Sequence, residues 1–159
     1  MNDLETNNVA EIPEYQIEQF HLTITKLYQC CQERMQYQSE KFALPDAELR
    51  CLMLFADERY LTGKGIARKM NVVKSRVSKI IEGLAKKNMI QRLKDPGDSR
   101  VILISLTPEG RDTLTKIKGF QDQIYQEVLG NMAPEQRKTM ITNLELLKAS
   151  MESAKELMV

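Results

Sequence analysis

The chain has 159 residues, a formal net charge of +1 and 42% hydrophobic residues, which is the composition of one compact globular unit with a good core. The sequence lacks an apolar run of the roughly 18 residues that a membrane helix requires. The first dozen residues are polar and acidic, unlike a signal peptide, and an odd number of cysteines cannot form a disulfide framework. A cytoplasmic protein is therefore expected.

Two helices are predicted in the first part of the chain. Pro13 can serve as the first residue of a long helix. Apolar residues then recur at steps of three and four, at Ile17, Phe20, Ile24, Leu27 and Cys31. A second helix is expected to begin near Pro45-Asp46 and to carry Leu49, Leu52, Met53 and Ala56.

The stretch from Leu61 to Gly110 predicts two short helices, a basic β-hairpin and the start of a new helix. Apolar residues at helical spacing precede Asn71 (Ile66, Ala67 and Met70) and follow it (Val77, Ile80, Ile81 and Leu84). Asn71 stands where the chain must turn, and asparagine tolerates left-handed backbone angles at modest cost. This order of elements is typical of a winged helix-turn-helix, which binds DNA.

Two further amphipathic helices are predicted after the hairpin. The first carries Leu114, Ile117, Ile124, Val128 and Leu129; after a restart at Ala133-Pro134-Glu135, the second carries Met140, Ile141, Leu144, Leu147, Met151, Ala154 and Met158.

Long terminal helices with this much apolar surface must bury it. We expect this surface to be buried in a two-fold helical bundle formed with a second copy of the chain. Packing of the helices within a single subunit is the alternative. The expected fold is mainly α with a small β-hairpin wing: a helical dimerisation region (14–44 and 111–158), a winged helix-turn-helix domain (45–110) and a flexible tail (1–13).

Positive charge is concentrated in the middle of the chain. Residues 59–100 contain twelve Lys or Arg and three acidic residues, a net charge of +9, whereas residues 1–58 carry −7 and residues 101–159 carry −1. Such asymmetry is expected of a surface that binds nucleic acid.

The chain resembles the MarR family of bacterial winged-helix regulators over residues 14–155. The resemblance rests on Leu61-Thr62-Gly63-Lys64-Gly65-Ile66-Ala67, on residues 75–84, on Ile90-Gln91-Arg92, and above all on Asp95-Pro96-Gly97-Asp98-Ser99-Arg100 followed by Leu106-Thr107-Pro108-Glu109-Gly110. It implies a homodimeric DNA-binding transcription regulator, most often a repressor that a small molecule releases from a near-palindromic operator. Two departures stand out. Val73 replaces a frequent capping serine, and Gly97 and Ser99 replace frequent wing arginines.

Five residues of the second short helix are candidate DNA contacts. Val77, Ile80, Ile81 and Leu84 are expected to face the core, which leaves the other faces to Lys74, Ser75, Arg76, Ser78 and Lys79. Arg76 is the best candidate for a base edge, since arginine can contact guanine O6 and N7 together. A contact to phosphate alone is the alternative for Arg76, and phosphate contacts are expected for the other four.

The wing supplies the remaining DNA-binding candidates: Arg92, Lys94, Asp98, Ser99 and Arg100. The resemblance implies that Arg100 enters the minor groove, with Asp98 holding its guanidinium or the turn. Purely local stabilisation of the turn is an equal alternative for Asp95 and Asp98.

Some residues outside the DNA-binding candidates could serve a sensory or catalytic site. The resemblance implies an effector pocket, for which Tyr28, Met35, Met53 and Phe55 are candidates, although such residues are more often part of the core. Thiol-based redox sensing at Cys30, Cys31 or Cys51 is an alternative trigger, although buried inert thiols are favoured because few cations lie nearby. An enzyme is not expected, and neither is a metal or cofactor site, because His21 is the single histidine and no phosphate-binding or metal-spaced motif occurs. A winged-helix module that binds protein instead of DNA is the more distant alternative.

Overall fold

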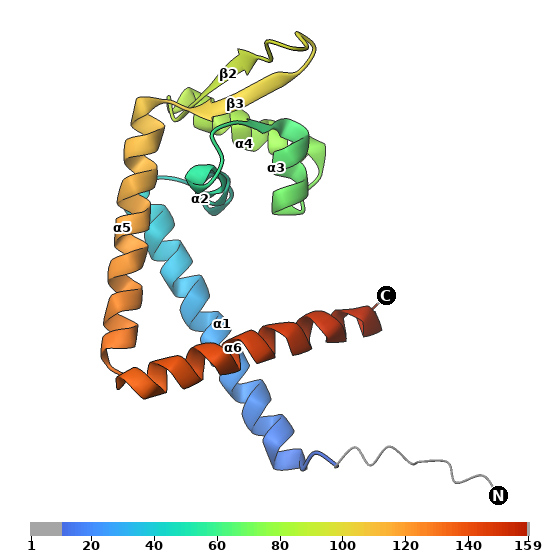
Figure 1. Ribbon diagram of the computed structural model, residues 1–159, viewed down its shortest axis with the longest axis vertical. Coiled ribbons are helices and arrows are strands. Elements are labelled where there is room, and N and C mark those ends of the chain that lie inside the picture. Colours follow the sequence, from blue (N-terminus) through green and yellow to red (C-terminus); the bar gives the residue numbers. More distant parts are fainter. Residues whose placement is uncertain (1–10, 159) are drawn as a thin grey trace, which may run out of the picture.

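The computed structural model describes residues 11–158 and confirms the mainly helical winged-helix fold (Figure 1). The helices are α1 (Glu14–Phe42), α2 (Asp46–Met53), η1 (Leu54–Ala56), α3 (Gly63–Met70), α4 (Lys74–Lys86), α5 (Pro108–Gly130), α6 (Pro134–Ala154) and η2 (Lys155–Met158). The strands are β1 (Leu61–Thr62), β2 (Ile90–Lys94) and β3 (Ile102–Leu106). Pro13 is the residue before α1 and not its first helical residue. The predicted flexible tail lies mostly in residues 1–10, outside the described part of the chain.

The turn between α3 and α4 has the predicted geometry. Asn71 adopts the left-handed conformation, with φ 54°. The hydroxyl oxygen of Thr62 accepts a hydrogen bond from the Gly65 amide (3.0 Å) and so caps the start of α3. Val73 occupies the corresponding position before α4 and provides no side-chain cap.

The sheet has three antiparallel strands in the order β1-β3-β2, one more than the predicted hairpin. In β1, Leu61 pairs with Ile104 of β3. In the hairpin, Ile90 pairs with Leu106 and Lys94 with Ile102. The hairpin is therefore joined to the start of α3 through β1.

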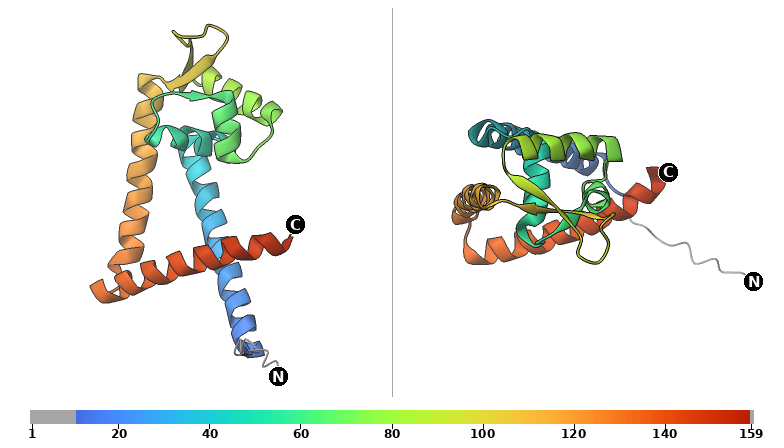
Figure 2. Two further views of the ribbon diagram at one scale, coloured as in Figure 1. Left: turned by 45° about the vertical axis from the view of Figure 1, so that its right-hand side comes forward. Right: turned by 90° about the horizontal axis from the view of Figure 1, so that it is seen from above.

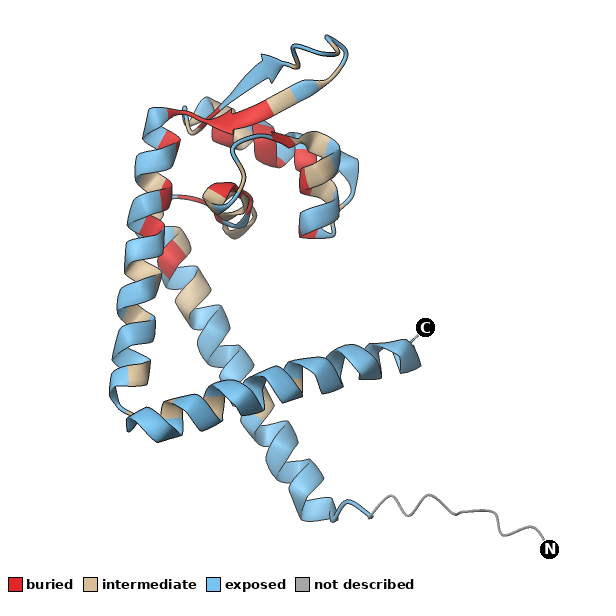
Figure 3. Ribbon diagram, viewed as in Figure 1, coloured by how far each residue is buried: buried red, intermediate tan, exposed pale blue. Residues whose placement is uncertain are grey.

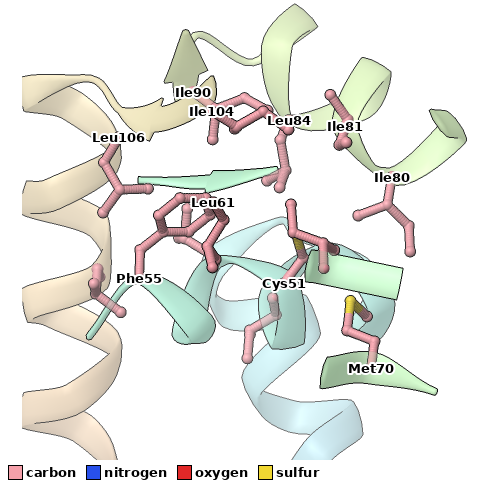
Figure 4. Close-up of a cluster of buried hydrophobic side chains, with 14 of the residues drawn as sticks. Cys51, Phe55, Leu61, Met70, Ile80, Ile81, Leu84, Ile90, Ile104 and Leu106 are labelled. Carbon is pink, nitrogen blue, oxygen red and sulfur yellow. The ribbon is translucent and has the colours of Figure 1, made fainter. Parts of the chain in front are cut away.

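The core lies between α2, α3, α4 and the sheet (Figure 4). Val77, Ile80, Ile81 and Leu84 of α4 are all buried, as predicted. They pack with residues from every neighbouring element, including Cys51, Phe55, Leu61, Ile66, Met70, Ile90, Ile104 and Leu106. We use "reading head" below for residues 45–107, which contain the wing and all of this core except Leu44, Leu114 and Ile117.

The long helices extend away from the reading head. Helix α5 leads down from β3, and α6 turns away from its far end (Figures 1 and 2). Figure 3 shows that buried residues gather in the reading head and the adjoining ends of α1 and α5. No residue of α6 is buried, and α1 buries only Gln38. No helix within residues 11–158 is long and apolar enough to cross a membrane.

Candidate nucleic-acid interface

The exposed face of α4 carries the predicted contact residues. Lys74, Ser75, Arg76, Ser78 and Lys79 are all exposed. Three of them, Ser75, Arg76 and Lys79, line a shallow hollow of about 310 Å³. The Ser78 hydroxyl donates to the Lys74 carbonyl (3.2 Å), so it must turn away from the helix before it can donate to another group.

The wing turn is organised by its two aspartates. The Asp95 carboxylate accepts a hydrogen bond from the Gly97 amide (2.7 Å). Asp98 accepts from the Arg100 amide (3.0 Å) and, with both carboxylate oxygens, from the Arg100 guanidinium (3.0 and 3.1 Å). These hydrogen bonds from Arg100 lower the pKa of Asp98. Asp95 therefore stabilises the turn locally, while Asp98 holds both the turn and the exposed Arg100 side chain.

Ion pairs divide the cations of the central block into two groups. Lys69 pairs with Glu58 (3.2 Å), Lys86 with Glu82 (3.1 Å), Lys87 with Glu48, and Arg100 with Asp98. Within the described residues 11–158, the other eight cations of the block have no carboxylate within ion-pair distance: Arg59, Lys64, Arg68, Lys74, Arg76, Lys79, Arg92 and Lys94. Five of these eight lie on α4 and on β2 of the wing. The charge that remains available to an anion is thus concentrated on the predicted interface.

Sequence reasoning counted Lys64 and Arg68 in the charged block but did not include them among the site candidates. Both are exposed residues of α3. The sequence could have indicated both residues as candidates. Ile66 and Met70 mark the buried face of that helix, so Lys64 and Arg68 are expected on its exposed side.

The reading head is fastened to α5 by a close contact. The Thr107 hydroxyl donates to the Asn88 carbonyl (2.6 Å) and accepts from the Gly110 amide (2.9 Å), which caps α5. A Cβ atom at Gly110 would lie 1.9 Å from the Met89 carbonyl oxygen, so only glycine fits there. The turn after α4 and the start of α5 are therefore held in close contact, and we call this contact the joint between the reading head and α5.

The four candidates for an effector pocket differ in their burial. Phe55 is 1% exposed and belongs to the core, and Met53 packs against that core. Tyr28 is exposed and Met35 is half-buried on α1. A pocket that includes all four stays a prediction.

The cysteines differ from one another. Cys51 is buried as expected. Burial raises the pKa of its thiol to about 12, and the negative charge of Glu48 makes a smaller contribution in the same direction. The expectation of burial is wrong for Cys30 and Cys31 in the single chain, where both are exposed and line a hollow of about 710 Å³ between α1 and α5. The reason is that, within residues 11–158, α5 lies across the hollow from this stretch of α1 without burying it. His21 is also exposed, and residues 11–158 contain no group of three side chains suited to hold a metal ion.

Comparison with known proteins supports the same architecture. The MarR family model matches residues 44–102. The chain is 31% identical over 134 residues to the HTH-type transcriptional repressor MdtR of Bacillus subtilis, a match that covers 84% of this chain and 81% of MdtR. It is 29% identical over 101 residues to the uncharacterized HTH-type transcriptional regulator YdgJ of B. subtilis, covering 64% of this chain and 60% of YdgJ.

A solved structure shows the same fold. Streptococcus pneumoniae FabT in complex with DNA superposes with a TM-score of 0.72 at 20% identity, over 88% of this chain and 99% of FabT. The match to MdtR extends well beyond the reading head into the helices on either side. The chain is therefore a member of the MarR family of winged helix-turn-helix proteins, which are DNA-binding transcription regulators and not enzymes.

Proposed function

We propose that the protein is a repressor that binds a near-palindromic operator as a homodimer and leaves it when a small molecule changes the spacing of its two reading heads. The single observation that carries the dimer is the exposed apolar stripe on the long helices. On α1, Ile17, Phe20 and Leu27 are about half exposed, as are Ile141, Leu144 and Met151 on α6. Large apolar surface of this kind belongs in an interface.

The interface with DNA is assigned as follows. Arg76 contacts a base edge, and Lys74, Ser75, Ser78 and Lys79 contact phosphates. Arg92, Lys94 and Ser99 of the wing contact the sugar-phosphate backbone of the DNA. Arg100, held by Asp98, enters the minor groove. The unpaired cations of α4 and β2 support this assignment.

Repression is supported by the similarity to MdtR, which is named a transcriptional repressor. Release by a small molecule is supported by the contact of Thr107 with Asn88 and Gly110, which ties the reading head to the start of α5. Because that joint links each reading head to a long helix, a ligand that tilts the helix changes the distance between the heads.

The test combines sedimentation and footprinting of the full chain on its own upstream DNA. A dimer at micromolar concentration is expected, with two protected half-sites about one helical turn apart. A monomer, or a footprint without two-fold symmetry, contradicts the proposal.

Thiol-based sensing remains a second candidate trigger, because Cys30 and Cys31 are exposed and share one hollow. Cys51 does not contribute to it, because burial keeps this thiol protonated.

A further inference from the structure

One apolar side chain at the start of α4 is exposed although nothing in the reading head packs on it. Val73 is 69% exposed. The other exposed large hydrophobic residues of the reading head are between 40% and 43% exposed: Tyr60, Leu93 and Ile102. The neighbouring Val72 packs against the core, whereas Val73, within residues 11–158, belongs neither to the core nor to the residues packed against it. The fold of the reading head therefore gives no reason for an apolar residue here.

The backbone of Val73 fixes where its side chain is presented. Its angles are extended (φ −70°, ψ 152°), and its carbonyl accepts hydrogen bonds from the amides of Arg76 (3.1 Å) and Val77 (3.2 Å). Val73 thus occupies the capping position, from which a polar side chain would reach the amides of the first turn. A β-branched side chain also has few rotamers, so it loses little conformational entropy when it enters a contact.

The surroundings of Val73 are cationic. Lys74, Arg76 and Lys79 are exposed on the first turns of α4, and within residues 11–158 none of them has a carboxylate within ion-pair distance. Figure 1 shows the turn between α3 and α4 on the side of the reading head away from α5. Lysine is depleted in the centre of protein interfaces, whereas it is a common contact to DNA phosphates. These surroundings favour DNA, and not another protein surface, as the cover of Val73.

We propose that Val73 contacts the C5-methyl group of a thymine in the major groove, beside the base edge assigned to Arg76. Thymine presents its methyl group in that groove, where apolar side chains recognise it by direct contact. The N-terminal residues of a recognition helix are the ones that approach base edges. This specificity-determining role rests on the proposed function, because it requires α4 to lie in the groove of an operator.

The same contact gives a physical reason for the missing cap of α4. Serine in place of Val73 would satisfy an amide of the first turn but would offer no methyl group to the base. Valine leaves the helix start uncapped and, in the free protein, gains no burial in return. Burial of its methyl groups against thymine occurs only on DNA, so stability of the free reading head is exchanged for recognition of a base.

The test uses the full chain and the duplex that it selects from a pool of random sequences. Each thymine of the selected site is replaced in turn by deoxyuridine, which removes only the methyl group. At one position per half-site, wild type is expected to lose about fourfold in affinity for each half-site changed, the value of one buried methyl group. Val73→Ala and Val73→Ser should bind the thymine and uracil duplexes alike, and thermal melts check that both variants fold.

Lys79→Ala is the matched control on the same helix. Loss of a phosphate contact should weaken binding to both duplexes equally and keep the ratio between them, with a smaller salt dependence. The two valine variants should instead lose the ratio and keep the salt dependence of wild type.

Three results would overturn the role of Val73: a selected site without thymine, wild-type binding that no uracil substitution weakens, or a thymine preference that either valine variant retains. Sedimentation covers the other possible occupant, since a change of oligomeric state in Val73→Ser would assign the residue to an interface between copies. A pool from which no sequence is enriched contradicts the proposed function itself. A two-fold symmetric site without a methyl effect overturns only the contact made by Val73.

Discussion

At the scale of single residues, the start of α4 lacks the side-chain hydrogen bond that usually caps a helix. Val73 has extended backbone angles suited to a capping residue, but its side chain cannot accept a hydrogen bond and is 69% exposed. Val73→Ser should therefore raise the free energy of unfolding by about 1 kcal/mol. Urea unfolding at fixed protein concentration measures the change, with Val73→Ala as the control that adds no cap. A serine variant no more stable than the alanine variant would contradict this account.

Arg76 and Lys79 allow base contacts to be distinguished from phosphate contacts, because both are exposed and line the same hollow on α4. Arg76→Ala should cost about 1–3 kcal/mol on the operator and relax the preference at one base position per half-site. Lys79→Ala should weaken binding to all sequences alike and reduce the salt dependence by about one unit. Titrations on operator and on unrelated duplex, at several salt concentrations, separate the two effects. If Arg76→Ala loses affinity equally on both duplexes, Arg76 contacts only phosphate.

At the scale of elements, two glycines of α5 in different surroundings test the joint with the reading head. Gly110→Ala should destabilise the protein by about 1–3 kcal/mol or more, because the new methyl group meets the Met89 backbone. Gly119→Ala, with nothing within 4 Å of its Cβ position, should instead stabilise the helix by about 0.5–1 kcal/mol. Thermal unfolding of the pair measures both signs. Equal effects of the two changes would show that the contact at Met89 imposes no restraint.

Helix α6 offers a matched pair for the proposed dimer. Leu144 lies on the stripe with Met140 and Leu147, whereas Leu146 points to the opposite face and is 68% exposed. Leu144→Glu should convert the dimer to monomer at micromolar concentration, since a charge in an apolar interface has no partner. Leu146→Glu should leave the dimer intact. Sedimentation of both variants is the measurement, and a dimer that survives Leu144→Glu would place the interface elsewhere.

Local signals were sufficient to predict the order of the helices and the wing. Asn71 marked the turn, Thr107-Pro108 marked the start of α5, and helical spacing identified the buried face of α4. Strand β1 was not predicted because a strand of two residues shows no periodicity. Its partner β3 also lies some forty positions further along the chain, so local sequence does not indicate the pairing. The resemblance offered two roles for Asp98, to hold the Arg100 guanidinium or to hold the turn, and the sequence could not choose between them; in the folded turn Asp98 does both.

At the scale of the whole molecule, the cysteines decide between the two candidate triggers. A variant with Cys30, Cys31 and Cys51 all changed to serine or alanine should still bind operator and still respond to the ligand, while mild peroxide should have little effect on wild type. Adjacent cysteines in a helix point about 100° apart and are poorly placed to bridge each other. Operator binding and a non-reducing gel before and after peroxide are the measurements. A crosslinked dimer that drops DNA and recovers with reductant would establish the redox trigger.

The exposure of the long helices explains why sequence reasoning misjudged Cys30 and Cys31. Helical spacing correctly showed which face of α1 is apolar, but it could not show what covers that face. Within residues 11–158, the only buried residue of α1 is Gln38, near the end of the helix where Tyr37 and Phe42 pack against Phe120 with ring centroids 5.8 and 5.9 Å apart. In the same described range, the remainder of α1 and all of α6 contain no buried residue, and this exposed surface is what supports the proposed dimer.

The absence of any buried residue in α6 has a consequence for the lifetime of the protein in a cell. Under the proposed function, a newly made subunit that has not met its partner presents 21 helical residues that its own core does not hold in place. Helices without tertiary packing open readily. Cellular proteases cleave such segments first. Unpaired copies should therefore be short-lived, so that the amount of regulator in the cell depends on the rate of pairing as well as on the rate of synthesis.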